Sequence, residues 1–158
     1  MQRKRIKIEY IPDVINRNEA KALYKYLKFN IDWQDGVYSR TGQTRLSAGV
    51  NPLKHKRLLA VIVQTLAEFP EYDFTLHQVY LNYYRDGNDS TPSHKHPNTC
   101  QIIISLGACR TLKIATKEYE MTNGSVAIFG PSLHSVPKQP KCKRGRISIA
   151  LFTTIRKT

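Results

Sequence analysis

The chain has 158 residues, of which 25 are Lys or Arg and 12 are Asp or Glu, so its formal net charge is +13. This length predicts a single domain over residues 1–158, and the lack of any run of 18 apolar residues argues against a membrane-spanning helix. The charge excess favours a polyanionic partner, although a basic surface that only serves solubility is an alternative. We expect nucleic acid, DNA or RNA, as that partner, and no membrane.

The N-terminus and the cysteines bear on where the protein works. Residues 1–5 are basic, but charge interrupts the stretch that follows, which is atypical of a secretory signal. Cys100, Cys109 and Cys142 form no CxxC pair and no even disulfide framework, which favours reduced thiols. We therefore expect an intracellular, cytoplasmic monomer, and its compactness suits a bacterial, phage or other viral source.

One strand and one helix are expected in the first 30 residues. Residues 6–10 alternate apolar and polar side chains, as a half-buried strand does. Asn16 and Glu19 have the spacing of a capping box. The stretch 20–27 then predicts a helix with its apolar side chains on one face.

A second helix is expected after a loop or hairpin over residues 32–50. Asn51 and Pro52 open it, because proline is tolerated at the first helical position. Its body extends to about residue 69. The apolar residues expected on its buried face are Leu58, Leu59, Ile62, Leu66 and Phe69.

From residue 74 onward the pattern changes to short strands separated by turn residues. The strands are expected over 76–84, 101–105, 110–116, 125–129 and 146–153. Helices followed by strands predict an α+β fold in which two N-terminal helices back a curled sheet. The number of strands fits a double-stranded β-helix, or jelly-roll, core, with an ordinary β-sandwich that holds no metal as the alternative.

Three histidines and an arginine have the spacing of a metal site. His94 and His96 are two residues apart and project from the same side of an extended segment. His134 follows 38 residues after His96, and Arg146 lies 12 residues further on. Imidazoles with open coordination positions suit iron, zinc, copper or nickel. Histidines without a metal and a solvated arginine are the alternatives.

The order and spacing of several segments resemble the AlkB family of iron(II)- and 2-oxoglutarate-dependent dioxygenases. The first is Leu81-Asn82-Tyr83-Tyr84-Arg85-Asp86-Gly87, similar to that family's Asn-x-Tyr-x-x-Gly strand, and His94 follows it at the place of the first iron ligand. The later matches and one upstream match are 104–107 with 110–112, 123–129, 134–138, 146–149 and 44–48. The resemblance covers most of the chain and implies a jelly-roll oxygenase.

Carried over residue by residue, the resemblance assigns roles in the site. It makes His94 and His134 iron ligands, and it pairs Arg146 with the distal carboxylate of 2-oxoglutarate. Asn82 and Tyr84 would donate hydrogen bonds to the same cosubstrate. Ser148 stands where the family has an asparagine in its closing strand, so we expect it at the cosubstrate as well.

The chain departs from the family pattern at two places. His96 occupies the position of the family's aspartate ligand, and Phe152 replaces a second arginine. His96 is then a third ligand, or points away from a two-histidine site completed by water or a small anion, or marks an inactive descendant. The metal is expected to be Fe(II), with Zn, Mn or Ni as alternatives. Asp86 or Asp89 could supply the missing carboxylate, although solvated turns explain both residues.

The activity that the resemblance implies is oxidative demethylation or hydroxylation of a base in DNA or RNA, for repair or modification. The alternatives are a catalytically impaired nucleic-acid-binding protein on the same fold and an oxygenase of protein or small-molecule substrates. Substrate contacts are expected from the segment that resembles the family's lid and from the residue two after the second histidine. These residues are Trp33, Tyr38, Arg40, Arg45 and Asn98, with core or loop positions as the alternative for each.

Overall fold

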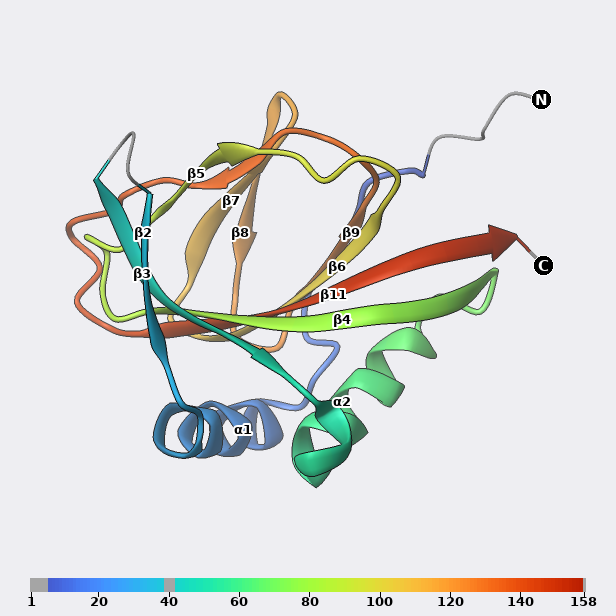
Figure 1. The fold of residues 1–158 in the computed structure, drawn as a ribbon, viewed down its shortest axis with the longest axis horizontal. Coiled ribbons are helices and arrows are strands. Elements are labelled where there is room, and N and C mark those ends of the chain that lie inside the picture. Colours follow the sequence, from blue (N-terminus) through green and yellow to red (C-terminus); the bar gives the residue numbers. More distant parts are fainter. Residues whose placement is uncertain (1–5, 39–41, 158) are drawn as a thin grey trace.

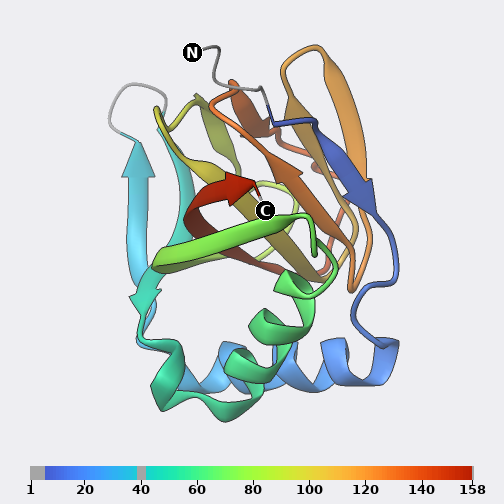
Figure 2. The same cartoon turned by 90° about the vertical axis from the view of Figure 1, so that its right-hand side faces the viewer.

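The computed structural model of the chain describes residues 6–38 and 42–157. Two antiparallel sheets face each other, and two helices cover the outer side of the larger one (Figures 1 and 2). This is the predicted α+β arrangement of a jelly roll backed by two N-terminal helices. No helix in the described ranges is long and apolar enough to cross a membrane.

The larger sheet has seven strands in the order β1-β9-β6-β11-β4-β3-β2. Their bounds are β1 Glu9–Ile11, β9 Val126–Phe129, β6 Cys100–Gly107, β11 Arg146–Lys157, β4 Tyr72–Tyr84, β3 Gln43–Val50 and β2 Gln34–Tyr38. The smaller sheet has four strands in the order β5-β10-β7-β8. Their bounds are β5 Thr91–His94, β10 His134–Val136, β7 Arg110–Ile114 and β8 Lys117–Met121.

Helix α1, Arg17–Asn30, begins where the capping pattern predicts. The side chain of Asn16 accepts a hydrogen bond from the backbone N–H of Asn18 at 2.9 Å, which satisfies one of the free donors at the helix start. Ala20, Leu23 and Leu27 recur at helical spacing and are buried against the large sheet. The helix is therefore fixed by its apolar face.

The second helix is broken near its start, which the sequence pattern did not predict. A 3-10 turn, η1, spans Pro52–Lys54, and helix α2 spans only Lys56–Leu66. His55 between them is extended, with φ of −136°, and its Nδ1 lies 2.8 Å from the hydroxyl oxygen of Tyr26 on α1. Of the predicted stripe, Leu58, Ile62 and Phe69 are buried and the other two are half-buried.

The region 32–50, predicted as a loop or a hairpin, is the hairpin of β2 and β3. The predicted strands of the C-terminal half are all present, with ends shifted by a few residues. Three short strands, β5, β8 and β10, had not been predicted, because none of them has a clear apolar alternation. Two of these three carry the metal-binding candidates.

Strand β11 lies at the centre of the large sheet and divides its side chains between two layers. Ile147, Ile149 and Leu151 belong to the core between the sheet and the helices. The residues between them face the smaller sheet, as the twofold alternation of a strand requires. The space between the two sheets holds a second, smaller core and, beside it, the candidate site.

Candidate metal centre

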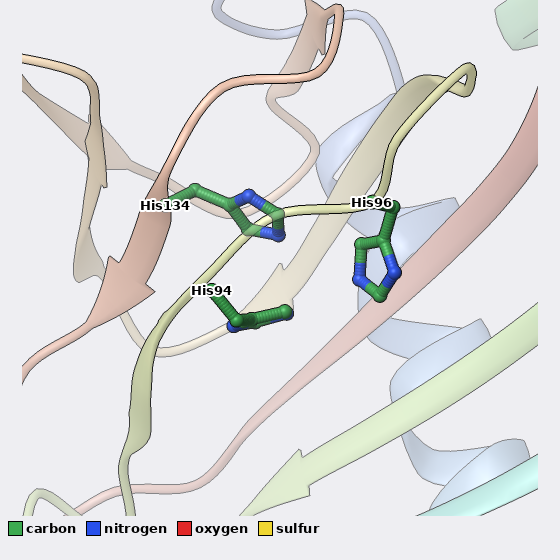
Figure 3. Close-up of side chains that lie close together, drawn as sticks. All are labelled: His94, His96 and His134. Carbon is green, nitrogen blue, oxygen red and sulfur yellow. The ribbon is translucent and has the colours of Figure 1, made fainter.

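The three predicted histidines lie together between the two sheets. His94 ends β5 and His134 begins β10, and antiparallel pairing places the two residues directly opposite each other. His96 follows β5 by two residues, so its ring returns to the same side (Figure 3). One ligand atom from each ring lies within 4.8 Å of the others. This spacing allows all three imidazoles to bind one ion.

Hydrogen bonds fix the tautomers of two of the rings. The Nδ1 of His94 lies 2.8 Å from the carbonyl oxygen of Pro92, and the Nδ1 of His134 lies 2.9 Å from that of Ser132. A carbonyl oxygen only accepts, so each Nδ1 carries the proton and donates it. Each Nε2 therefore keeps its lone pair, and both rings are oriented as metal ligands before any ion binds.

His96 is held by an aromatic contact. Its ring packs edge-on against Phe152, with the centroids 5.0 Å apart and the planes at 87°. Phe152 therefore supports the ring of His96 from the side.

Two of the imidazoles, those of His96 and His134, are neutral near pH 7. Burial, with a smaller contribution from His94, lowers the pKa of His96. Burial also lowers the pKa of His134 to about 4, although the hydrogen bond to Ser132 opposes the shift. Metal binding requires the neutral form, which these two groups already have.

The cavity around the histidines has a volume of about 500 Å³ and no acidic lining residue. All 12 acidic residues of the chain lie in its described ranges, so no undescribed residue could add a carboxylate to the cavity. Asp89 accepts hydrogen bonds from Arg85 and Thr44, and Asp86 accepts one from the backbone of Asn88. Both aspartates therefore accept hydrogen bonds outside the cavity and do not supply a carboxylate to it. The protein ligands of an ion at this site would all be imidazoles.

Arg146 lines the same cavity and carries two buried nitrogens without partners. Its Nε donates to the hydroxyl of Ser105 at 2.7 Å. Its two terminal nitrogens are fully buried and have no hydrogen-bond partner among the described residues. Burial lowers the pKa of this guanidinium to about 10, so it is still charged at neutral pH. A buried cation with two free donors needs an anionic ligand.

Arg110 is equally buried and shows what a fully paired arginine looks like in this fold. Its Nε donates to Gln139, and its terminal nitrogens donate to the carbonyl oxygens of Asp86, Asp89 and Pro137. Four of its five N–H donors bond to loop residues, so every one of its nitrogens has a partner within the protein. Burial in this fold therefore does not by itself leave an arginine unpaired, and the two unpartnered nitrogens of Arg146 are specific to its place in the cavity.

The residues predicted to contact a cosubstrate surround Arg146. Asn82 and Ser148 are paired across β4 and β11, and both line the cavity together with Tyr84. The Nε of Arg45 donates to Oδ1 of Asn82 at 2.6 Å, which leaves the amide N–H groups of Asn82 as donors to a ligand. The hydroxyl of Tyr84 shares a hydrogen bond of 2.7 Å with Thr91.

The structure describes the side chains of three predicted substrate residues and places two of them away from the cavity. Of these three, only Arg45 lines the cavity. Trp33 packs against the helix-side core, with its ring 5.4 Å from that of Tyr83. Asn98 is exposed in a turn with a positive φ of 59°, a conformation that asparagine tolerates. The side chain of Tyr38, like the whole of Arg40, lies outside the part that the structure describes.

Sequence reasoning missed three lining or supporting positions. Ser105 holds Arg146, Thr91 holds Tyr84, and Gln101 lines the cavity. Ser105 and Gln101 point inward because they alternate with buried apolar residues along β6. Ser105 and Gln101 could have been predicted from the sequence, because they are polar residues within an otherwise apolar strand.

No protein-family model matches the chain, and no curated protein matches it either. Solved structures do. HygX from Streptomyces hygroscopicus, determined with nickel and 2-oxoglutarate bound, has a TM-score of 0.73 at 10% identity, covering 93% of this chain and 82% of its own. A prolyl-4-hydroxylase from Pseudomonas putida has a TM-score of 0.63 at 15% identity, covering 94% and 92%.

A third similar structure is a prolyl hydroxylase from Trichoplax adhaerens in complex with a hypoxia inducible factor peptide. Its TM-score is 0.66 at 13% identity, covering 93% of this chain and 83% of its own. The fold is the jelly roll of 2-oxoglutarate oxygenases. At these identities the likeness concerns the fold, and the closer resemblance to AlkB proteins stays a prediction.

Proposed function

We propose that the chain is a 2-oxoglutarate-dependent oxygenase whose iron is bound by three histidines. The observation that carries the proposal is the pair of unpartnered nitrogens of Arg146, buried in the same cavity as the histidine cluster. A guanidinium binds a carboxylate through two parallel hydrogen bonds. 2-Oxoglutarate is a dicarboxylate, so it could bind Arg146 with one end and the metal with the other.

Each residue of the site has a separate task in this proposal. His94, His96 and His134 would hold Fe(II), with Zn, Mn or Ni as alternative ions. Arg146, held by Ser105, would bind the distal carboxylate, while Asn82, Tyr84 and Ser148 orient the rest of the cosubstrate. When bound, iron(II) and 2-oxoglutarate supply the activation of dioxygen, with succinate and carbon dioxide as products. The apolar floor around Ala150 would keep water away from the reacting group.

We infer that the substrate is a methylated base in DNA or RNA, removed from its stack and oxidatively demethylated. The net charge of +13 supports this substrate class. So does an exposed basic stretch in the loop between β10 and β11, made up of Lys138, Lys141, Lys143 and Arg144. These side chains would bind phosphates without reading the sequence.

A second candidate is an oxygenase of protein substrates. Two of the similar structures are prolyl hydroxylases, and one was solved with a peptide. The third alternative is a protein of the same fold that binds nucleic acid without turnover, because three neutral imidazoles leave the metal more positive than a site with an aspartate does.

One assay separates these candidates. The protein is incubated with iron(II), 2-oxoglutarate and either methylated oligonucleotides or proline-containing peptides. We expect succinate and formaldehyde with a methylated oligonucleotide, and neither with His134→Ala, which lacks a ligand. Peptide hydroxylation would favour the second candidate. Oligonucleotide binding without any succinate would contradict catalysis and favour the third.

A further inference from the structure

Three side chains form a row across the cavity floor at some distance from Arg146. On the central strand, Phe152 is paired with Gln78 of β4 on one side and with Gln101 of β6 on the other. All three line the cavity. We call Gln78, Phe152 and Gln101 the glutamine row.

We propose that the glutamine row recognises the substrate base, and that this base is an uncharged methylated base. The inference rests on the proposed function and deepens it. It replaces the predicted contacts of Trp33 and Asn98 with residues that the fold places beside the metal ligands.

Gln101 points to a ligand most directly. The residue is only 4% exposed and lines the cavity, yet its carboxamide atoms are not among the fully buried polar atoms of the described residues, so they open onto the cavity. A ligand that fills the cavity would cover this amide and would then have to supply its hydrogen-bond partner. A carboxamide presents an acceptor and a donor side by side, which matches the edge of a base such as adenine.

Phe152 places that ligand next to the metal. Its ring contacts the ring of His96 at a centroid distance of 5.0 Å, so a group packed against Phe152 also lies near the histidine cluster. Aromatic side chains hold unstacked bases by stacking, whatever the sequence. The phenyl group and the two amides therefore provide the stacking and the edge contacts that a base needs.

The row is far enough from Arg146 to leave room for the cosubstrate. Phe152 lies six residues from Arg146 on the same face of β11, so two inward-facing positions separate them. Between them the floor is formed by Ser148 and Ala150, whose side chains are small. A dicarboxylate bound at Arg146 and a base bound at the row would occupy different ends of one floor.

The charge of the cavity selects among methylated bases. Its lining contains the cations Arg45 and Arg146, a divalent ion would add two more charges, and no acidic side chain lines it. A base that is cationic after ring methylation, such as 1-methyladenine, would be repelled. A base that is neutral after methylation of its exocyclic amine, such as N6-methyladenine, would not.

Binding can be measured without turnover. The zinc-loaded protein is titrated with labelled single-stranded oligonucleotides that carry one N6-methyladenine, one 1-methyladenine or plain adenine, and fluorescence anisotropy reports affinity. We expect N6-methyladenine to bind most tightly. Gln101→Ala should weaken that binding about tenfold, as the loss of one or two hydrogen bonds predicts.

Two further variants make the test specific. Gln101→Glu keeps the shape of the side chain but adds a negative charge, so it should shift the preference toward 1-methyladenine. Gln64→Ala removes an exposed glutamine on α2 and should change nothing. The inference is overturned if Gln101→Ala and Phe152→Ala leave the affinity for the N6-methyladenine oligonucleotide intact, if the wild type prefers 1-methyladenine, or if a proline-containing peptide displaces the oligonucleotide.

Failure of this inference and failure of the proposed function give different results. Slow succinate formation from 2-oxoglutarate without a prime substrate reports on the oxygenase site alone. If succinate forms while no base preference exists, the oxygenase stands and the row is not its recognition site. If base preference depends on Gln101 while no succinate ever forms, the row binds bases and the oxygenase proposal is wrong.

Discussion

Arg146 and Arg110 are the two largest fully buried side chains among the described residues, but their roles differ. Arg110 donates to four oxygen acceptors and stabilises the loops around it. Arg146 donates one hydrogen bond, to Ser105, and lies over the ring of Tyr84, but its two terminal nitrogens have no hydrogen-bond partner among the described residues, so its burial costs folding free energy that a bound anion would offset. One buried arginine thus stabilises the jelly roll, while the other is available to bind a ligand.

Methionine at these two positions should therefore have opposite effects. Arg146→Met should leave the free energy of unfolding unchanged or raise it by about 1–4 kcal/mol, because it removes an uncompensated buried charge. Arg110→Met should lower it by about 3 kcal/mol or more, because several buried acceptors lose their donor. Urea denaturation measures both. A large destabilisation by Arg146→Met would mean that the guanidinium is already paired within the protein.

His96 decides whether the centre has two protein ligands or three. The geometry groups its ring with the other two, so His96→Ala should weaken zinc binding by at least roughly ten- to a hundredfold, the loss seen when a residue that only orients a ligand is removed. Competition with a chelating dye measures the affinity. His55→Ala, which removes a histidine between η1 and α2, is the control. Equal affinity of wild type and His96→Ala would leave a two-histidine site.

At the scale of elements, the sequence predicted the parts that have a strong pattern. The cap of α1, the buried stripe of α2 and the apolar strand β6 each show it, and each is present. The break at His55 and the strand β5 were not predicted, because a tertiary contact with Tyr26 and pairing with β10 create them. The histidine cluster was found from spacing, whereas the glutamine row needed the register of three strands.

The turn before β5, which leads to the first histidine, is held by Asp89. Burial raises the pKa of its carboxyl, but hydrogen bonds from Arg85 and Thr44 outweigh burial, so the pKa lies below its ordinary value. The stabilisation is therefore present above the unfolded pKa of about 3.9 and is lost as pH falls through the folded value. This turn should be a point of acid sensitivity.

Asp89→Asn should lower the free energy of unfolding at pH 7 by about 1–3 kcal/mol, because the hydrogen bonds from Arg85 to a charged group are weakened. The difference from wild type should begin to shrink as the pH falls below about 4, where the carboxyl of the unfolded chain becomes protonated, and should be smallest once the native carboxyl is protonated at lower pH. Urea denaturation across this pH range measures it. A difference that is constant with pH would exclude the charged carboxylate as its source.

For the whole molecule, the helices and the smaller sheet lie on opposite sides of the large sheet (Figure 2), and the candidate site lies on the side of the smaller sheet. Exposed basic residues occur on both sides, on α1 and in the loop between β10 and β11. The composition gave the net positive charge, but not the side of the large sheet on which the basic residues lie. If the polyanion enters the cavity, the loop rather than the helix should bind its phosphates.

Salt dependence of oligonucleotide binding tests this placement. Replacing Lys141, Lys143 and Arg144 by alanine should reduce the slope of log affinity against log salt by about 2, since each lost phosphate contact removes about 0.7 on a single strand. Replacing Lys21, Lys25 and Lys28 on α1 removes the same charge from the helix side and should change the slope little. Equal effects of the two triple variants would mean that binding follows net charge alone.

Calorimetric titration of 2-oxoglutarate into the zinc-loaded protein tests the central claim most directly, since it joins the histidine cluster to Arg146 in one binding event. We predict one site per chain, with affinity lost both in the metal-free protein and in Arg146→Met. Binding that is equally strong without metal, binding that survives Arg146→Met, or no binding at all would contradict the account.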